Sequence, residues 1–149
     1  MSLKNRLTYE LKDESGTVYY RAEYKHNSEV LIVTWLERLL SDELLLSGSK
    51  QSLEIIDTLK IKYLINDTSR YPIGWFGILE WYEKEWLPTA EVLGLKLGAI
   101  IMSFNFFGQL SAEEVKNICL KHNSPIQLRL FLSKREAETW IDSMRNKTN

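Results

Sequence analysis

Apolar and polar positions alternate along the first third of the chain, which predicts extended strands. Residues 7–12 alternate weakly, and residues 17–26 alternate cleanly between an apolar and a mostly charged face. Period-two spacing is typical of a strand with one exposed face. Residues 30–35 are almost uniformly apolar, as expected of a strand covered on both faces. Turn-forming residues separate the three segments, so we predict an antiparallel meander.

Beyond this meander the apolar spacing changes to about 3.6 residues, which predicts a helix followed by a strand. The helix is expected over about 42–58, with Ser41 or Asp42 as its N-cap. Gly48 weakens the middle of this helix by about 1 kcal/mol relative to alanine. A strand is expected over 61–65, ended by a polar run.

An aromatic-rich helix is predicted to begin near Pro72, since proline is tolerated in a first helical turn. Pro88 interrupts this helix or starts a new one, and Gly94 suits the residue after a helix end. Residues 96–102 then predict another buried strand. The large side chains of the helix share one face: Trp75, Leu79, Tyr82 and Trp86.

Two capping boxes predict the last helices. Ser111-x-x-Glu114 indicates a helix over about 111–122, and Ser133-x-x-Glu136 indicates a second one. Alternation over 126–131 predicts the strand between them, and the polar residues 145–149 are expected to fray.

The predicted element order is β-β-β-α-β-α-β-α-β-α. It predicts an α/β fold with a mixed, mostly parallel sheet and an N-terminal antiparallel meander, forming one domain over residues 1–149.

Four segments carry a resemblance to a known family: YLINDTSR (63–70), EWYEKEWLPTAEVLGLKLGAIIM (80–102), FGQLS (107–111) and EAETWI (136–141). In element order the chain resembles the STAS fold of anti-anti-sigma factors. It looks more like the bacterial STAS-like proteins that are sometimes grouped with lipid-binding Sec14-type domains. The resemblance implies a non-enzymatic regulatory or protein-interaction module, and we expect it to act as a homodimer.

One position departs from the anti-anti-sigma pattern. Those factors carry a phosphoacceptor hydroxyl at the start of the helix that follows a strand ending in aspartate. Aligning Asp67 with that strand end puts the acceptor near residues 74–77, where this chain reads Gly-Trp-Phe-Gly. Thr68 and Ser69 come too early. The chain is therefore expected to lack the usual phosphoacceptor.

Composition excludes several classes of function. The chain has 149 residues, with 19 basic and 20 acidic side chains, so nucleic-acid binding is not expected. One cysteine, no signal-like apolar segment and no run long enough to span a membrane favour a cytoplasmic protein. His26, His122 and Cys119 lack metal-ligand spacing, and no cofactor motif occurs, so no metal, cofactor or catalytic residue is predicted.

A candidate ligand or partner site lies where two predicted parallel strands end. Asp67 closes one strand, residues 103–108 follow the next, and ligands of open α/β sheets lie beyond such ends. The alternative is that residues 67–69 only cap the next helix. The aromatic residues left over from the predicted core stripe suggest an interface. The candidate residues are Asp67, Thr68, Ser69, Arg70, Trp75, Phe76, Trp81, Asn105, Phe106 and Phe107.

Three functions remain open at this point. The first is the homodimeric interaction module. The second is a carrier of a small apolar or acyl ligand near Asp67 and residues 104–107. The third is an enzyme that uses Asp67 with Ser69 or Arg70, which has the least support because no base–nucleophile spacing is visible. The acidic cluster Glu80, Glu83 and Glu85 is expected to form a solvated helix face, and Cys119 is expected to be a buried small hydrophobe.

Overall fold

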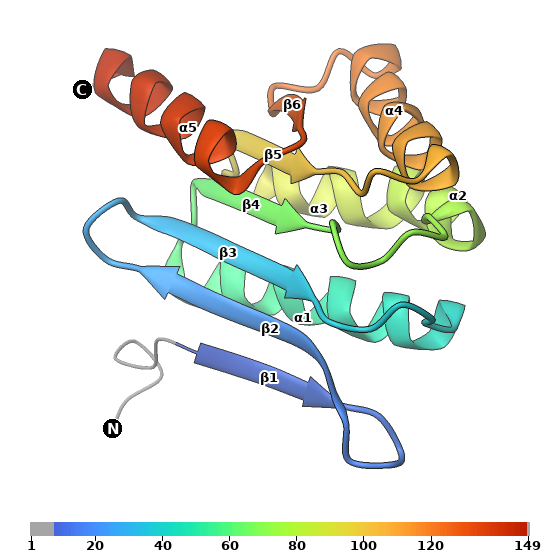
Figure 1. Cartoon of the computed structure of the whole chain (residues 1–149). Coiled ribbons are helices and arrows are strands. Elements are labelled where there is room, and N and C mark those ends of the chain that lie inside the picture. The colour runs from blue at the N-terminus through green and yellow to red at the C-terminus, as the bar shows by residue number, and fades with distance from the viewer. Residues whose placement is uncertain (1–7, 149) are drawn as a thin grey trace.

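Six strands and a set of helices form an α/β fold in the computed structural model, which describes residues 8–148 (Figure 1). The strands are β1 Thr8–Lys12, β2 Val18–Lys25, β3 Val30–Trp35, β4 Tyr63–Asp67, β5 Leu97–Ile101 and β6 Gln127–Phe131. The helices are α1 Asp42–Leu59, α2 Leu79–Trp81, α3 Leu87–Val92, α4 Phe106–Lys121 and α5 Lys134–Thr148. The predicted order of elements is confirmed.

The strands lie in the sheet in the same order as in the chain, β1-β2-β3-β4-β5-β6. The pairs β1–β2 and β2–β3 are antiparallel, and the pairs from β3 to β6 are parallel. The predicted meander and mostly parallel sheet are thus confirmed. The strand expected over 61–65 lies two residues later, so that Asn66 and Asp67 belong to β4.

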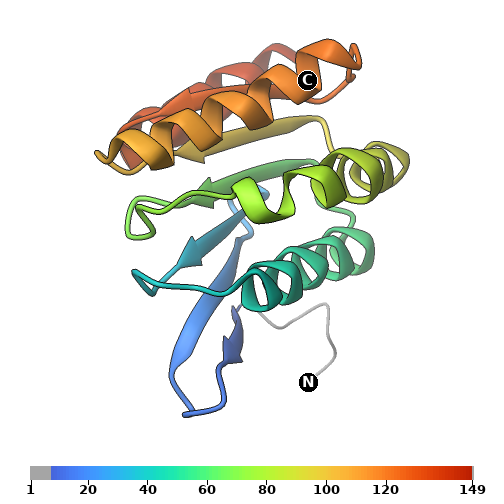
Figure 2. The ribbon, with the colours of Figure 1, turned by 90° about the vertical axis from the view of Figure 1, so that its right-hand side faces the viewer.

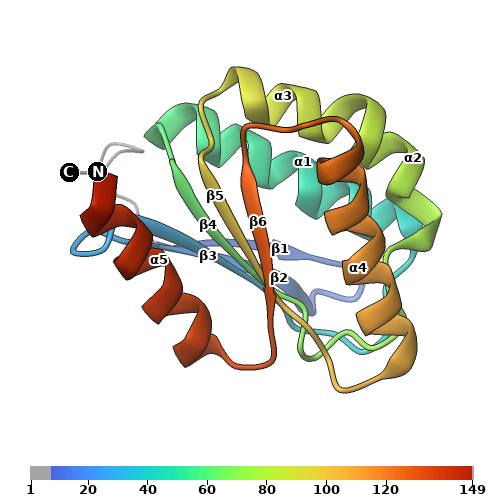
Figure 3. The same ribbon diagram turned by 90° about the horizontal axis from the view of Figure 1, so that it is seen from above.

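Helices cover the two faces of the sheet unequally. Figure 2 and Figure 3 show α1, α2, α3 and α4 on one face and α5 on the other. The larger core joins the first face to α1 and to the α2–α3 region, while Ala137 and Ile141 of α5 pack on the opposite face. In the part of the chain that the structure describes, no helix is long and apolar enough to cross a membrane.

Helix α1 begins as predicted, since the Ser41 hydroxyl accepts a hydrogen bond from the Leu44 amide. Close packing against the sheet explains why a glycine, Gly48, lies in the middle of this helix. A Cβ added at Gly48 would lie 2.3 Å from the indole ring of Trp35 in β3. The glycine therefore allows the helix to approach the sheet closely, which offsets its poor helix propensity.

The helix expected to begin near Pro72 begins later. Residues 72–75 are a loop, with Gly74 at a φ of 97°, and a short 3₁₀ turn starts at Phe76. The π-helical turn Tyr82–Trp86 then joins α2 to α3. It ends two residues before Pro88, whose missing N–H and ring prevent an ordinary α-helical hydrogen bond to the preceding turn. Gly94 follows the end of α3 at a φ of 93°, as predicted for the residue after a helix end.

The capping box predicted at Ser111 is wrong. Helix α4 begins five residues earlier, because the Asn105 side chain accepts a hydrogen bond from the Phe107 amide and caps the helix. Phe106 and Phe107, which were expected in a loop, are its first two residues. In α5 the Ser133 cap is confirmed by its bond from the Glu136 amide. The tail expected to fray continues this helix to Thr148.

Candidate functional site

Exposed apolar side chains gather at one edge of the sheet. Among residues 8–148, all of the exposed large hydrophobic residues except Val92 and Leu120 follow the carboxyl ends of the parallel strands. Those ends share one edge, as the loops in Figure 3 show. The residues are Leu39 after β3, Ile73 and Phe76 after β4, Phe104, Phe106, Phe107 and Leu110 after β5, and Leu132 after β6.

The segments after β4 and β5 form one continuous surface. A Cβ added at Gly74 would lie 3.0 Å from the carbonyl oxygen of Phe107, and one added at Gly108 would lie 3.4 Å from that of Pro72. The two loops therefore touch. We call the surface that they carry the carboxyl-edge patch; it consists of Ile73, Phe76, Phe104, Phe106, Phe107 and Leu110.

Three phenylalanines dominate this patch. The exposed fractions are 83% for Phe104, 70% for Phe106 and 58% for Phe107. The rings of Phe106 and Phe107 meet edge to face with centroids 5.6 Å apart. Contiguous apolar surface of this kind makes the patch a candidate site of interaction.

Hydrogen bonds within the chain occupy four of the five polar residues that were predicted at this edge, Asp67, Thr68, Ser69 and Asn105. Asp67 Oδ1 accepts from the Ser69 amide at 3.0 Å and from its hydroxyl at 2.6 Å, which forms a turn. The buried Thr68 hydroxyl donates to the Ile101 carbonyl at 2.7 Å. Asn105 caps α4. These groups shape the loops under the patch.

A second hydroxyl, unpredicted from the sequence, holds the loop after β4 against α4. Ser111 is fully buried, and its oxygen accepts a hydrogen bond of 2.7 Å from the Trp75 amide. Trp75 in turn meets Trp35 edge to face at 4.7 Å. The predicted residue Trp75 is thus half-buried and belongs to the interior side of this loop.

Beneath this loop lies a mainly apolar cavity of about 80 Å³, between the sheet and the helices of the larger core. Trp75 is the one predicted candidate residue that lines it. Its sheet side is made by residues of β4, β5 and β6, among them Leu64, Asn66 and Gly98. Asn66 was expected to end a strand, and no local pattern in the sequence indicates its place in a cavity wall.

Trp81 lies apart from the other predicted residues, because it packs against the larger core. The structure brings Asp67–Arg70, Trp75, Phe76 and Asn105–Phe107 to the same edge. Ile73 and Leu110 were missed. Leu110 could have been predicted from the sequence if Asn105 had been taken as the N-cap of the helix, because Leu110 then lies one turn after Phe106 and Phe107 on the same face.

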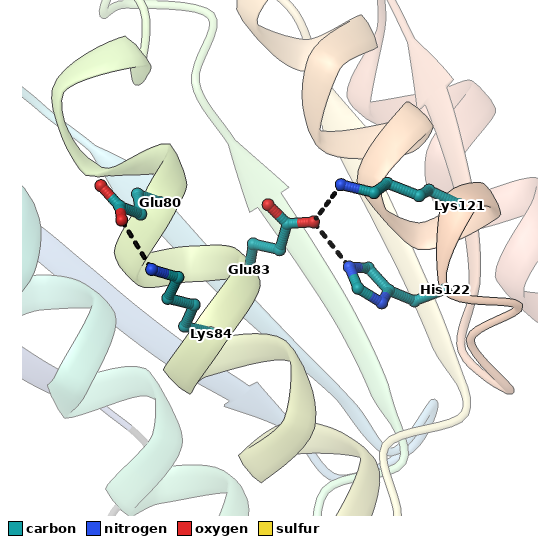
Figure 4. Close-up of polar contacts among 5 residues, drawn as sticks. All are labelled: Glu80, Glu83, Lys84, Lys121 and His122. Carbon is teal, nitrogen blue, oxygen red and sulfur yellow. Dashed lines mark hydrogen bonds and ion pairs between the residues drawn. The ribbon is translucent and has the colours of Figure 1, made fainter.

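The acidic helix face is only partly solvated, because one of its residues, Glu83, contacts the end of α4 (Figure 4). Glu83 Oε2 lies 2.6 Å from Nε2 of His122 and 3.1 Å from Nζ of Lys121, at the end of α4. The hydrogen bond with His122, and then that from Lys121, hold the pKa of Glu83 below its usual value of 4.5. Glu80 pairs with Lys84 at 2.7 Å in solvent, as expected.

Few groups in the described chain suit metal or nucleophilic chemistry. Residues 8–148 contain no cluster of three or more His, Cys, Asp or Glu side chains that suits a metal ion. Cys119 is buried, and burial raises the pKa of its thiol, which makes it a poor nucleophile.

Comparisons with protein-family models, with curated proteins and with solved structures found no match.

Proposed function

We propose that the chain is a protein-interaction module of STAS-like type that acts as a homodimer through the carboxyl-edge patch. The observation that carries the proposal is the gathering of exposed apolar side chains at this one edge. The proposal assigns no catalysis to the chain.

The size of the patch suits a second copy. Its six side chains expose roughly 600 Å² when each aromatic ring is taken as 150–250 Å². A standard interface uses about 800 Å² from each partner, with a polar rim around an apolar centre. The loops beside the patch supply such a rim.

Charges near the patch also favour a second copy over an anionic lipid surface. The loops at this edge carry both signs, with Glu37 and Arg38 after β3, and with Asp67 and Arg70 at and after the end of β4. Surfaces that bind anionic lipid are rich in lysine and arginine alone. A rim of mixed sign is self-complementary when two copies face each other across a twofold axis.

The resemblance to anti-anti-sigma factors implies a switch by phosphorylation, which the proposed module lacks. No hydroxyl occurs at Gly74–Gly77, and the buried Thr68 hydroxyl, which precedes this segment, already donates to a backbone carbonyl. Regulation of the module by phosphate at this position is therefore not part of the proposal.

Light scattering coupled to gel filtration tests the dimer. We expect a dimer at about 10 µM, the range of standard-sized interfaces. The double variant Phe104→Ser/Phe106→Ser is expected to be monomeric and folded, because both side chains are already exposed in the monomer.

The matched control is Val92→Ser/Leu120→Ser, which removes two exposed apolar side chains away from the patch. This control is expected to remain dimeric. A monomeric wild type, or equal dissociation of both double variants, contradicts the proposal. A monomeric wild type that sediments with neutral phosphatidylcholine vesicles assigns the patch to a lipid surface instead.

The cavity beneath Trp75 favours a second candidate function, the carriage of a small, mainly apolar ligand. The site then lies between the sheet and the helices, with Asn66 and Gly98 in its wall. It is not formed by Asp67 and residues 104–107, where the sequence pattern suggested it.

A further inference from the structure

A missing side chain leaves the room for the cavity. Gly98 lies in β5 in register with Leu64 on one side and Leu128 on the other, so a residue without a side chain interrupts this row of leucines. Its φ is not in the left-handed region. A Cβ added there would meet one neighbour, a methyl group of Leu128 at 3.1 Å. Neither backbone conformation nor close backbone contact requires this glycine, and such a glycine in a strand interior often marks the close approach of a ligand.

Asn66 supplies a hydrogen-bond donor to the same space. The Trp35 indole nitrogen donates to Asn66 Oδ1 at 2.8 Å. An indole N–H can only donate, so the amide oxygen must face Trp35 and the Nδ2 group must face away from it. Within residues 8–148, Nδ2 of Asn66 has no hydrogen-bond acceptor, and it is not among the fully buried atoms that lack a partner, so a molecule the size of water can reach it. The amide is therefore open to an acceptor that comes from outside the chain.

Flat aromatic rings make the opposite wall. Tyr82 and Trp86, both from the π-helical turn, are stacked with centroids 5.2 Å apart and planes 18° from parallel. Trp75 adds a third aromatic side chain. Aromatic walls favour a flat ring, which can stack on them or meet them edge to face. Isolated π-helical turns occur frequently at functional sites.

Several other polar groups of the lining already have hydrogen-bond partners, whereas the Ser49 hydroxyl has none within residues 8–148. The Ser52 hydroxyl bonds to the Tyr20 hydroxyl at 2.7 Å, and Ser49 offers its carbonyl to the Trp86 indole at 3.0 Å. The lining contains no Asp, Glu, Lys, Arg or His. Burial raises the pKa of Tyr82 and of Cys119, so both stay neutral. A charged ligand would lack a partner here, and water would find too few polar contacts.

We propose that this cavity binds a flat, uncharged ring that carries a hydrogen-bond acceptor, with Asn66 as the donor and Gly98 as the residue that leaves the space. The cavity of about 80 Å³ is smaller than the roughly 150 Å³ that encloses benzene in an engineered protein. The ring therefore enters the cavity only in part, and the rest of the ligand projects past the partly exposed Trp75 and Tyr82. The inference rests on the second candidate function and is independent of dimerisation.

Three fluorinated probes of equal shape test this site by ¹⁹F NMR: 4′-fluoroacetophenone, 4-fluoro-isopropylbenzene and 4-fluorobenzoate. They share the ring and differ in whether the branched substituent offers a neutral acceptor, no acceptor or a charge. We expect the ketone to bind with a Kd of about 1 mM or below. The hydrocarbon should bind about 3- to 10-fold more weakly, because it leaves Asn66 unpaired. The benzoate should not bind at about 5 mM, since its charge has no partner.

Two cavity-filling variants from different elements locate the binding. Gly98→Val in β5 and Ala112→Leu in α4 should each weaken ketone binding at least about tenfold by occupying the space. Glu113→Leu, at the exposed position beside Ala112, is the matched control and should bind as the wild type does. Circular dichroism checks that each variant is folded.

A readout on the wild type alone guards against variants that misfold. In ¹⁵N-resolved spectra the ketone should shift the Asn66 side-chain amide and the indole signals of Trp75 and Trp86. Equal binding of all three probes, no binding of the ketone at about 5 mM, or shifts confined to the carboxyl-edge patch overturns the proposal. The dimer variant Phe104→Ser/Phe106→Ser should bind the ketone unchanged, so a failure here is distinguishable from a failure of the dimer.

Discussion

Gly48 of α1 lies directly against the indole ring of Trp35 in β3. A methyl group at Gly48 would meet the ring at 2.3 Å, far inside van der Waals contact. Gly48→Ala raises helix propensity by about 1 kcal/mol, but the overlap costs about 1–3 kcal/mol because the core cannot yield. We expect Gly48→Ala to lower the urea midpoint. Lys50→Ala, exposed in the same helix, is the control and should stay within about 0.5 kcal/mol of wild type; a stabilised Gly48→Ala would show that the indole can move aside.

Ser111→Ala tests the bond that holds the loop after β4 to α4. The variant leaves the Trp75 amide without its acceptor, and we expect a loss of about 1–2 kcal/mol in the free energy of unfolding. The loosened loop should also be cut faster by trypsin after the exposed Arg70. Ser143→Ala, in an exposed turn of α5, serves as control for the change in helix propensity. Unchanged cleavage after Arg70 would argue against a role for this bond in the loop.

Glu83→Gln tests the contact between the π-helical turn and the end of α4. The pKa of Glu83 is held below 4.5 in the folded chain, chiefly by His122 and then by Lys121. The folded state therefore favours the carboxylate, and this stabilisation is present above pH 4.5 and lost as the pH falls through the lowered pKa.

We accordingly expect Glu83→Gln to unfold at lower urea than wild type at pH 7, with the difference disappearing in acid below the lowered pKa. High salt should shrink the difference as well. Glu85→Gln, exposed nearby, should show neither effect. A difference that persists undiminished below the lowered pKa of Glu83 would contradict the assigned contact.

Cys119 should be inert in the native chain. It is buried 3.7 Å from the Tyr82 hydroxyl, and burial raises the pKa of its thiol, so little thiolate is present at neutral pH. We expect its reaction with a chromogenic disulfide reagent to be at least about tenfold slower than in urea. The chain has one cysteine, which makes the rate unambiguous. Equal native and denatured rates would show that the thiol is accessible.

Periodicity in the sequence predicts most of the fold, and it fails where a distant contact outweighs a local signal. The Ser133 cap is a local feature, and it is confirmed. Ser111-x-x-Glu114 is an equally good local signal, but Asn105 caps the helix first and the Ser111 hydroxyl serves Trp75, 36 residues away. Propensity alone gives no means of choosing between two adjacent caps.

The candidate site divides in the same way. The edge beyond Asp67 follows from strand order alone, because parallel strands end on one side of a sheet. The cavity does not follow from strand order. The place of Asn66 in its wall depends on the hydrogen bond from Trp35, which lies 31 residues earlier. The role of Gly98 likewise depends on Leu64 and Leu128, which lie beside it on the neighbouring strands.

Strand order equal to chain order has a consequence for synthesis. A chain leaving the ribosome can add each strand to an edge that already exists, and α1, α3 and α4 cover one face as they emerge. The opposite face, with Ile32, Ile65 and Ile101, is covered only by the last 15-residue helix. The nascent protein therefore carries an open apolar face until α5 has been made, and a ribosome that stalls before residue 134 holds a chain with one face of its sheet uncovered and prone to aggregate.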